Sequence, residues 1–231
     1  SGGADEQRTD AAGKGVNVAR TVAASGVATI AVLPLADGAP YGPLLRSTGL
    51  VIRAVPVGAR VRTNLTLTAP DGEPTKINLP GGALDEAELD AIIAVVIAAA
   101  RGAEWLVLAG SLPPGVPDDA YARITAAVRA AVSPAPRIAV DTAGAALAAA
   151  VQAPQPGRPD LIKPNEDELA ELVGTDSLAG EAEVAAAAST LVRTGIANVL
   201  VTLGGDGAIL ADAAGVLATP APRIRVSSTG G

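Results

Sequence analysis

Residues 105–140 read WLVLAGSLPPGVPDDAYARITAAVRAAVSPAPRIAV, and this stretch decides the fold class. It opens with the run Trp105–Ala109, whose length and apolar character are typical of a buried strand. An Ala-rich helix is predicted at Asp118–Ala131, and a second strand at Arg137–Val140. A strand, a helix and a strand in this order form the unit from which parallel sheets are built.

The same alternation continues on both sides of this stretch for most of the chain. Further strands are predicted at Thr29–Leu33, Asp160–Lys163, Val199–Leu203 and Ala208–Ala211. Further helices are predicted at Gly15–Ala24, Asp85–Ala100, Glu166–Val173 and Glu181–Thr194. We therefore expect residues 1–231 to form a single α/β domain, with a doubly wound, mostly parallel sheet flanked by helices. Sheets of this kind bind ligands at the carboxyl ends of their strands.

The segment from Val51 to Leu79 interrupts the alternation, because it has no helical period. Polar and apolar residues alternate over Arg62–Thr68, Pro70–Glu73 is typical of a turn, and Thr75–Leu79 returns. This pattern predicts a β-hairpin with polar side chains on one face, either as an edge extension of the sheet or as a small lid.

The composition excludes several kinds of chemistry. The 231 residues include no His, Cys or Met, which excludes imidazole bases, thiol nucleophiles, disulfides and ordinary zinc sites. A net charge of −7 argues against nucleic acid as a partner, whereas a small phosphorylated ligand needs only a local cluster of cations. The longest apolar run, Ala91–Ala100, is far shorter than the roughly 18 residues that span a membrane. No signal peptide is visible, so we expect a soluble cytoplasmic protein, and the lack of Met indicates that part of the open reading frame is missing.

Two motifs early in the chain carry cations that a ligand could use. Gly13 and Lys14 precede a predicted helix with Asn17 in its first turn, where exposed amides and the positive end of the helix dipole favour an anion or a hydroxyl-rich ligand. An ordinary loop-to-helix turn explains the same residues. Arg62 and Lys76, on adjacent strands of the hairpin, could hold a phosphate, or they could be cross-strand surface charges.

Two motifs follow predicted strands in the second half. Gly110-Ser111 begins a proline-stiffened loop that places a hydroxyl and amides at the ligand-binding edge, or that is simply a tight connection. In the run that begins at Lys163, Asn165 and Glu168 have the spacing of a capping box, which needs no function. Alternatively, they lie near a hydrated Mg²⁺ while Lys163 meets a nucleotide phosphate.

A third motif, from Val201 to Ala208, contains Thr202, Gly204 and Gly207. Its glycines permit positive φ and let a ligand approach the backbone. As a bare pattern, it is a hairpin turn between two strands.

The order of these motifs indicates a family, although none of them does so alone. Gly-Lys-Gly-x-Asn, Arg-Thr-Asn, Thr-Lys-Ile-Asn, Gly-Ser-Leu-Pro-Pro-Gly, Lys-Pro-Asn-x-x-Glu-Leu and Val-Thr-Leu-Gly-x-Asp-Gly follow one another along the chain. This series resembles the PfkB (ribokinase-like) carbohydrate kinases from about Gln7 to Thr229. Within that family, the stretch Thr75–Gly81 makes the chain most similar to the 1-phosphofructokinases.

The resemblance implies a kinase that uses ATP and Mg²⁺ to convert fructose 1-phosphate into fructose 1,6-bisphosphate. Tagatose 6-phosphate or fructose 6-phosphate as substrate, or ligand binding without catalysis, are the alternatives. The sugar phosphate would be held by Gly13, Lys14, Asn17, Arg62, Lys76 and Ser111. The nucleotide would be held by Lys163, Asn165, Glu168, Thr202, Gly204 and Gly207, with Asn165 and Glu168 reaching Mg²⁺ through water. The resemblance also implies a ribokinase-like fold with a β lid formed mainly by about residues 4–12 and 51–81, and a homodimer that pairs through this lid.

The chain departs from the family pattern at its ends. The family's catalytic Gly-Ala-Gly-Asp is expected just after Ser228-Thr229, where the sequence reads Gly230-Gly231. We therefore expect the catalytic Asp to lie beyond the given chain, and the family's first strand upstream of Ser1. Leu79 also stands where the most similar relatives carry Glu. An intact signature downstream would favour the enzyme, and a stop codon there would favour the non-catalytic relative.

Overall fold

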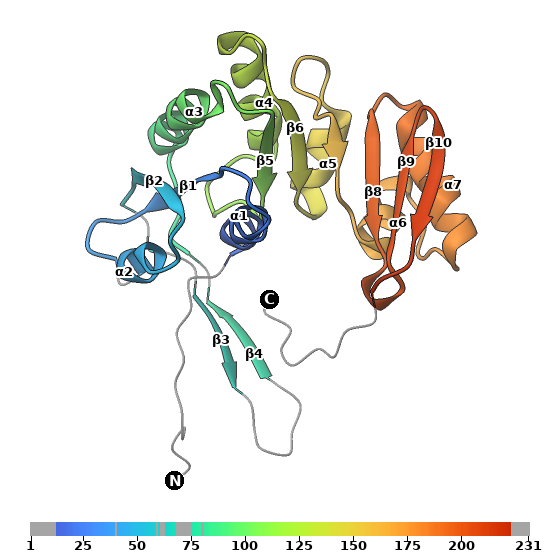
Figure 1. The fold of residues 1–231 in the computed structure, drawn as a ribbon, viewed down its shortest axis with the longest axis horizontal. Coiled ribbons are helices and arrows are strands. Elements are labelled where there is room, and N and C mark those ends of the chain that lie inside the picture. Colours follow the sequence, from blue (N-terminus) through green and yellow to red (C-terminus); the bar gives the residue numbers. More distant parts are fainter. Residues whose placement is uncertain are drawn as a thin grey trace. The chain divides into compact units, whose positions relative to one another are not determined.

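Helices and strands alternate for much of the chain, with consecutive strands within residues 51–79 and 198–219 and two consecutive helices within residues 166–193 (Figure 1). The computed structural model describes residues 13–39, 41–58, 60 and 81–222, together with the backbone of residues 63–67 and 75–79. These residues divide into two units, one comprising 13–92 with 113–115 and the other comprising 93–112 with 116–222. Helix α3 (Glu86–Ala100) begins in the first unit and ends in the second.

The second unit is built on a six-stranded sheet with the order β10-β9-β8-β7-β6-β5. Strands β5 to β8 pair in parallel, and β9 and β10 are added through antiparallel pairing. The mostly parallel sheet that we predicted from the alternation of strands and helices is therefore confirmed. The six strands are β5 (Trp105–Ala109), β6 (Arg137–Asp141), β7 (Leu161–Ile162), β8 (Asn198–Thr202), β9 (Ala208–Asp212) and β10 (Gly215–Thr219).

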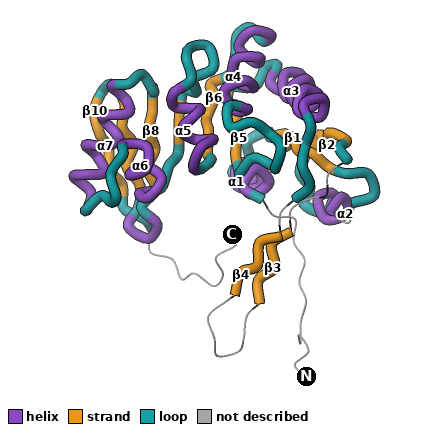
Figure 2. The backbone as a smooth tube through the Cα atoms, turned by 180° about the vertical axis from the view of Figure 1, so that it is seen from behind, coloured by secondary structure: helices purple, strands orange, loops and turns teal. Residues whose placement is uncertain are grey.

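Four helices cover one face of this sheet, as the two opposite views in Figures 1 and 2 show. Because side chains alternate between the faces of a strand, Val199 and Val201 of β8 and Ile209 of β9 are fully buried in one cluster with residues of α7. Full burial of a Val or Ile side chain is worth about 1.5–3 kcal/mol, so this cluster fixes α7 on the sheet. The four helices are α4 (Ala120–Ala131), α5 (Gly144–Gln152), α6 (Glu166–Val173) and α7 (Glu181–Arg193).

The first unit contains a smaller α/β arrangement. Its strands β1 (Ile30–Leu35) and β2 (Val51–Pro56) pair in parallel, with Ile30 opposite Val51. Val16 of α1 and Leu45 of α2 form the buried centre of a small apolar cluster with residues of β1 and β2 packed around them. Helix α1 spans Lys14–Ala24, and α2 spans Tyr41–Arg46.

The predicted hairpin is confirmed as β3 (Thr63–Leu67) and β4 (Thr75–Leu79), which pair antiparallel with Thr63 opposite Leu79. Val51–Pro56 does not extend this hairpin, because it pairs with β1 instead. The hairpin strands are therefore shorter than the expected 51–81 segment. The function of the hairpin as a lid stays a prediction, as does its partnership with residues 4–12, which lie outside the described residues.

Several elements agree with the sequence analysis and others were missed. Trp105–Ala109 and Glu166–Val173 have the predicted bounds. The missed elements are β2, α2, α5 and β10. No helix in the described part of the chain combines the length and the apolarity that crossing a bilayer requires.

Candidate functional site

The segments predicted to bind a nucleotide lie at neighbouring strand ends in the second unit. Lys163 directly follows β7, and Asn165 forms an isolated parallel bridge with Thr202 at the end of β8. The Thr202 amide donates to the Pro164 carbonyl at 3.0 Å. Two motifs separated by about forty residues of sequence are thus brought side by side at the carboxyl edge of the sheet, where α/β proteins bind ligands.

Asn165 and Glu168 form the predicted capping box at the start of α6. The Glu168 amide donates to Asn165 Oδ1 at 2.8 Å, and the Asn165 amide donates to Glu168 Oε2 at 2.9 Å. This arrangement confirms the structural interpretation of the motif. It engages only one carboxylate oxygen of Glu168, so the other oxygen can accept a hydrogen bond from a water of a hydrated Mg²⁺, the mode in which this ion is usually held. Among the described residues, no group of three or more acidic side chains could hold a metal ion directly.

Lys163 has a partner that the sequence analysis missed. Its Nζ lies 3.2 Å from Oδ1 of Asp141, at the carboxyl end of β6, and the Asp141 residue is only 8% exposed. The predicted strand Arg137–Val140 stopped one residue before Asp141. The sequence places the Asp141 carboxylate directly after the predicted strand, which could have marked it as a site residue. Its pairing with Lys163 depends on the register between β6 and β7, which the sequence does not give.

The Gly-rich turn after β8 has a structure of its own. The Leu203 amide donates to the Gly207 carbonyl at 2.8 Å, and Gly204–Asp206 forms a single 3₁₀ turn. Gly207 has φ +125°, and a Cβ there would lie 2.0 Å from the Thr219 carbonyl oxygen. The turn between β8 and β9 therefore requires Gly207 for packing whether or not a ligand binds, whereas no atom of the described residues lies within 4 Å of a Cβ placed at Gly204.

The loop after β5 carries Ser111, whose residue is exposed. Gly110, directly before it, donates its amide to the Asp141 carbonyl at 2.9 Å and accepts the Tyr121 hydroxyl at 2.7 Å. Burial, with a smaller contribution from the Asp141 carboxylate, raises the pKa of Tyr121 to about 12, so its hydroxyl stays a donor at neutral pH. The next residue after Asp141, Thr142, is 1% exposed, and its hydroxyl has no hydrogen-bond partner in the described structure.

The predicted sugar-phosphate residues of the first unit lie at the start of α1. Lys14 is the first residue of the helix, one position earlier than predicted, and Gly13 precedes it with φ 130°. The Asn17 amide closes the first turn by donating to the Gly13 carbonyl at 2.9 Å. The residue before this helix, Gly13, has no side chain that could cap it, and ligand binding at the start of α1 stays a prediction.

Of the two cations predicted on the hairpin, the structure describes the backbone of one. Lys76 is in β4 with its backbone opposite Thr66, and Arg62 lies outside the described residues. The proposal that these cations hold a phosphate therefore stays a prediction.

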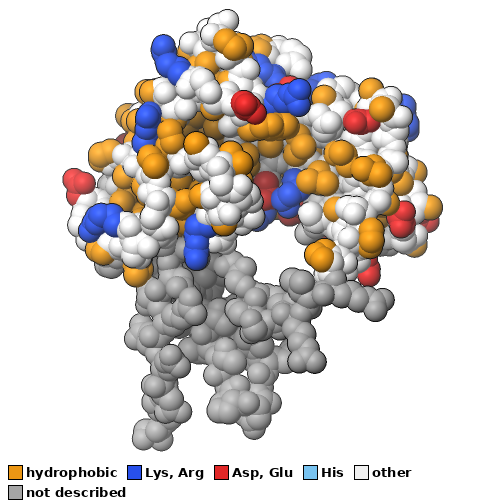
Figure 3. All heavy atoms as spheres, viewed as in Figure 1, with side chains coloured by type: hydrophobic (Ala, Val, Ile, Leu, Met, Phe, Trp, Pro, Cys, Tyr) orange, Lys and Arg blue, Asp and Glu red, His pale blue; other side chains and the backbone are white. Residues whose placement is uncertain are grey.

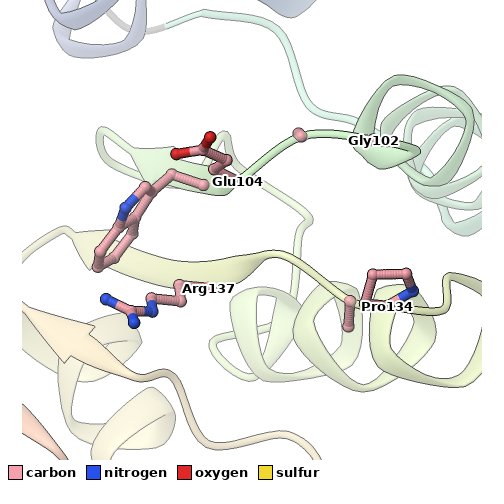
Figure 4. Close-up of a pocket in the computed structure, with 7 residues that line it drawn as sticks. Gly102, Glu104, Pro134 and Arg137 are labelled. Atoms are coloured by element: carbon pink, nitrogen blue, oxygen red, sulfur yellow. The ribbon is translucent and has the colours of Figure 1, made fainter.

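A shallow pocket of about 500 Å³ lies at the opposite, amino ends of β5 and β6. The Arg137 guanidinium there lies 5.7 Å from the centre of the Trp105 ring. Figure 4 shows Arg137 and Glu104 at this pocket. None of the predicted site residues lines this pocket. On the face drawn in Figure 3, Lys and Arg side chains of the described residues are scattered among acidic and apolar ones.

Comparison with known proteins accounts for the order of the motifs. Residues 3–231 match the family model described as pfkB family carbohydrate kinase. The chain belongs to this family of carbohydrate kinases. The 1-phosphofructokinase of Rhodobacter capsulatus is 38% identical over 229 residues, which cover 97% of this chain and 70% of that protein. The 1-phosphofructokinase of Xanthomonas campestris pv. campestris is 36% identical over 231 residues, covering 99% and 71%.

Solved structures of pfkB-type kinases share the fold. Phosphofructokinase-2 from Escherichia coli, crystallised in complex with fructose-6-phosphate, superposes with a TM-score of 0.82 at 31% identity. The match covers 94% of this chain and 70% of that chain. The ribokinase-like fold predicted from the motifs is thereby confirmed.

Proposed function

We propose that the protein transfers the γ-phosphoryl group of ATP to fructose 1-phosphate and forms fructose 1,6-bisphosphate. The observation that carries this proposal is the adjacency of the Lys163–Glu168 and Thr202–Gly207 segments at one sheet edge. The choice of sugar is supported by the relatives at 36–38% identity, which are 1-phosphofructokinases.

On the nucleotide side, the Lys163 ammonium would contact the phosphates, and the Thr202–Gly207 turn would line the nucleotide pocket. Asn165 and Glu168 would orient Mg²⁺ through its water ligands. When bound, the ion would offset charge on the phosphate oxygens. The capping box supports these positions because it holds Asn165 and Glu168 in one geometry before any ligand arrives.

On the sugar side, binding of hydroxyl or phosphate oxygens is supported by the positive end of the α1 helix dipole, which lies at Lys14. The reacting hydroxyl oxygen of the sugar would attack phosphorus, the bond to the ADP oxygen would break, and the hydroxyl proton would pass to a general base. From the family resemblance, we expect that base to be an Asp that lies beyond the given chain. The proposed sugar-phosphate ligands remain Gly13, Lys14, Asn17, Arg62, Lys76 and Ser111.

Phosphoryl transfer suits the composition of this chain. Catalysis of this reaction consists mainly of positioning and charge stabilisation, so a kinase needs neither His nor Cys, and the chain has neither. A second candidate, phosphorylation of fructose 6-phosphate, is favoured by the structural similarity to the Escherichia coli enzyme, which was crystallised with that sugar.

Equilibrium binding tests the proposal directly, because recognition of a sugar phosphate does not depend on the base. Calorimetric titration with fructose 1-phosphate, fructose 6-phosphate, tagatose 6-phosphate and ribose should give the tightest binding for fructose 1-phosphate. Preference for fructose 6-phosphate would select the second candidate, and preference for ribose would reject both.

A charge variant tests the nucleotide side. Lys163→Gln should raise the Kd for Mg·ATP about tenfold or more, as expected when a charge-assisted contact is lost. Arg101→Gln, which removes the same charge from an exposed residue after α3, is the matched control and should leave this Kd within twofold of wild type. Equal Kd values for the two variants would exclude Lys163 from the nucleotide site.

The β3–β4 hairpin remains our candidate for a lid and for a homodimer contact. Its support is that β3 and β4 pair only with each other among the described strands, and a two-stranded hairpin is at best marginally stable in water without a covering surface. Light scattering at several protein concentrations should give the mass of a dimer, and a monomer at all concentrations would reject this assembly.

A further inference from the structure

Tyr121 connects helix α4 to the loop that carries Ser111. The Tyr121 side chain is buried, and its hydroxyl donates to the Gly110 carbonyl at 2.7 Å. The Gly110 amide donates in turn to the Asp141 carbonyl at 2.9 Å. The peptide groups on both sides of Gly110 are thus held immediately before the exposed Ser111.

This double attachment matters because of the residue it holds. Gly110 has φ +106°, in a region that glycine samples freely and in which no side chain limits the backbone. The two hydrogen bonds therefore restrict the direction in which the chain leaves β5, which the glycine itself does not. Of these two bonds, the one to Asp141 continues the pairing of neighbouring strands, whereas the one to Tyr121 comes from a side chain.

Tyr121 is itself firmly placed. It lies in the first turn of α4, and its carbonyl accepts the hydroxyl of Thr125 at 2.8 Å, one turn further along. Both residues are buried, at 8% and 0% exposure. Helix α4 thus presents the Tyr121 hydroxyl to Gly110, a residue with no side chain to restrict its backbone.

We propose that Tyr121 is a positioning residue, whose hydroxyl fixes the Gly110–Leu112 backbone and thereby orients Ser111 toward the sugar phosphate. The orientation of Ser111 toward the ligand rests on the proposed function. The effect on the loop backbone does not depend on any ligand.

Tyr121→Phe is the decisive variant, since it keeps the ring and removes only the hydroxyl. Ser189→Ala is the control, because it removes a half-buried hydroxyl whose hydrogen bond to the Ala185 carbonyl stays within α7 and does not involve Tyr121. Amide hydrogen exchange of a peptide covering residues 108–112 should accelerate about fivefold or more in Tyr121→Phe, as expected when a carbonyl loses its partner. The same peptide should exchange at the wild-type rate in Ser189→Ala.

Binding measurements then connect the loop to the ligand. The Kd for fructose 1-phosphate should rise about fivefold in Tyr121→Phe, and the Kd for Mg·ATP should stay within twofold of wild type. Unchanged exchange in Tyr121→Phe would overturn the inference whatever the ligand. Faster exchange with an unchanged Kd for the sugar, or with an equal rise in both Kd values, would overturn the assignment of Ser111 orientation to Tyr121. If the wild-type protein binds no sugar phosphate, the proposed function fails, and hydrogen exchange alone decides whether Tyr121 fixes the loop.

Discussion

Replacing Arg129 with Met should destabilise the second unit without weakening ligand binding. The Arg129 guanidinium donates to Gln155 Oε1 at 2.9 Å and to the carbonyls of Pro156 and Arg158 at 2.8 and 2.6 Å. It also pairs with Asp160 Oδ2 at 2.9 Å. The last turn of α4 is thereby tied to the connection between α5 and β7.

The magnitude follows from these contacts and from their exposure. A hydrogen bond to a charged group is worth about 1.5–3 kcal/mol, and the Arg129 side chain is only 17% exposed. Asp160 Oδ2 also accepts the Ile138 amide at 2.7 Å, so it keeps one partner when Arg129 is lost. The freed carbonyls are close enough to solvent to recover some hydration. We therefore expect the free energy of unfolding to fall by about 2–4 kcal/mol.

Urea unfolding followed by Trp105 fluorescence measures this loss. Trp105 is the single Trp of the chain and starts β5, so its emission reports on the second unit. The control is Arg193→Met, because exposed Arg193 makes a hydrogen bond to Thr190 Oγ1 within one helix. That variant should change the free energy of unfolding by no more than about 0.5 kcal/mol. Equal losses in the two variants would refute the reasoning.

Three other variants or titrations follow from the same structure. Asn165→Ala should lower the free energy of unfolding by about 1 kcal/mol in urea, since it removes the N-cap of α6; no loss would show that the capping box is not formed in solution. Thr142→Val should raise the free energy of unfolding by about 1 kcal/mol, because an isosteric apolar side chain replaces a buried hydroxyl that has no hydrogen-bond partner among the described residues; a lower stability would mean that this hydroxyl is bonded. The pKa of Tyr121 is about 12 in the folded protein and near 10 when unfolded, so between these pH values only the unfolded state ionises. The contribution of Tyr121 to stability is therefore intact below pH 10. As the pH rises toward 12, the free energy of unfolding should fall by up to about 1.4 kcal/mol per pH unit. Ultraviolet difference spectra of wild type and Tyr121→Phe should place this phenol's titration near pH 12, and a midpoint near 10 would contradict its burial.

The parts of the fold that local signals encode were predictable. Asn165 and Glu168 mark the start of α6, and Gly174, which has left-handed backbone angles, marks its end, so both bounds were correct. Helix α5 was missed because it opens with Gly144 and has no capping side chain. Strand β2 was missed because its partner β1 is remote in sequence and the polar hairpin that follows dominated the pattern.

For the candidate site, individual residues were predictable from the sequence, but their contacts were not. Lys163 and Thr202 could be named because each lies at the carboxyl end of a predicted strand. Their adjacency depends on strand order and register, which local sequence does not determine. Asp141 and Tyr121 were missed for the same reason, since their importance comes entirely from contacts with residues 11 to 31 positions away.

The Asp141–Lys163 pair has a consequence for how an anion can enter. Any phosphate that draws the Lys163 ammonium toward itself takes it away from a carboxylate with little access to water, and that loss subtracts from the affinity. An anion that arrives with its own divalent counter-ion brings positive charge to the same strand ends and offsets the loss. With Lys163 at the nucleotide phosphates, as proposed, the protein should bind metal-complexed polyphosphates more tightly than free ones before any group is transferred.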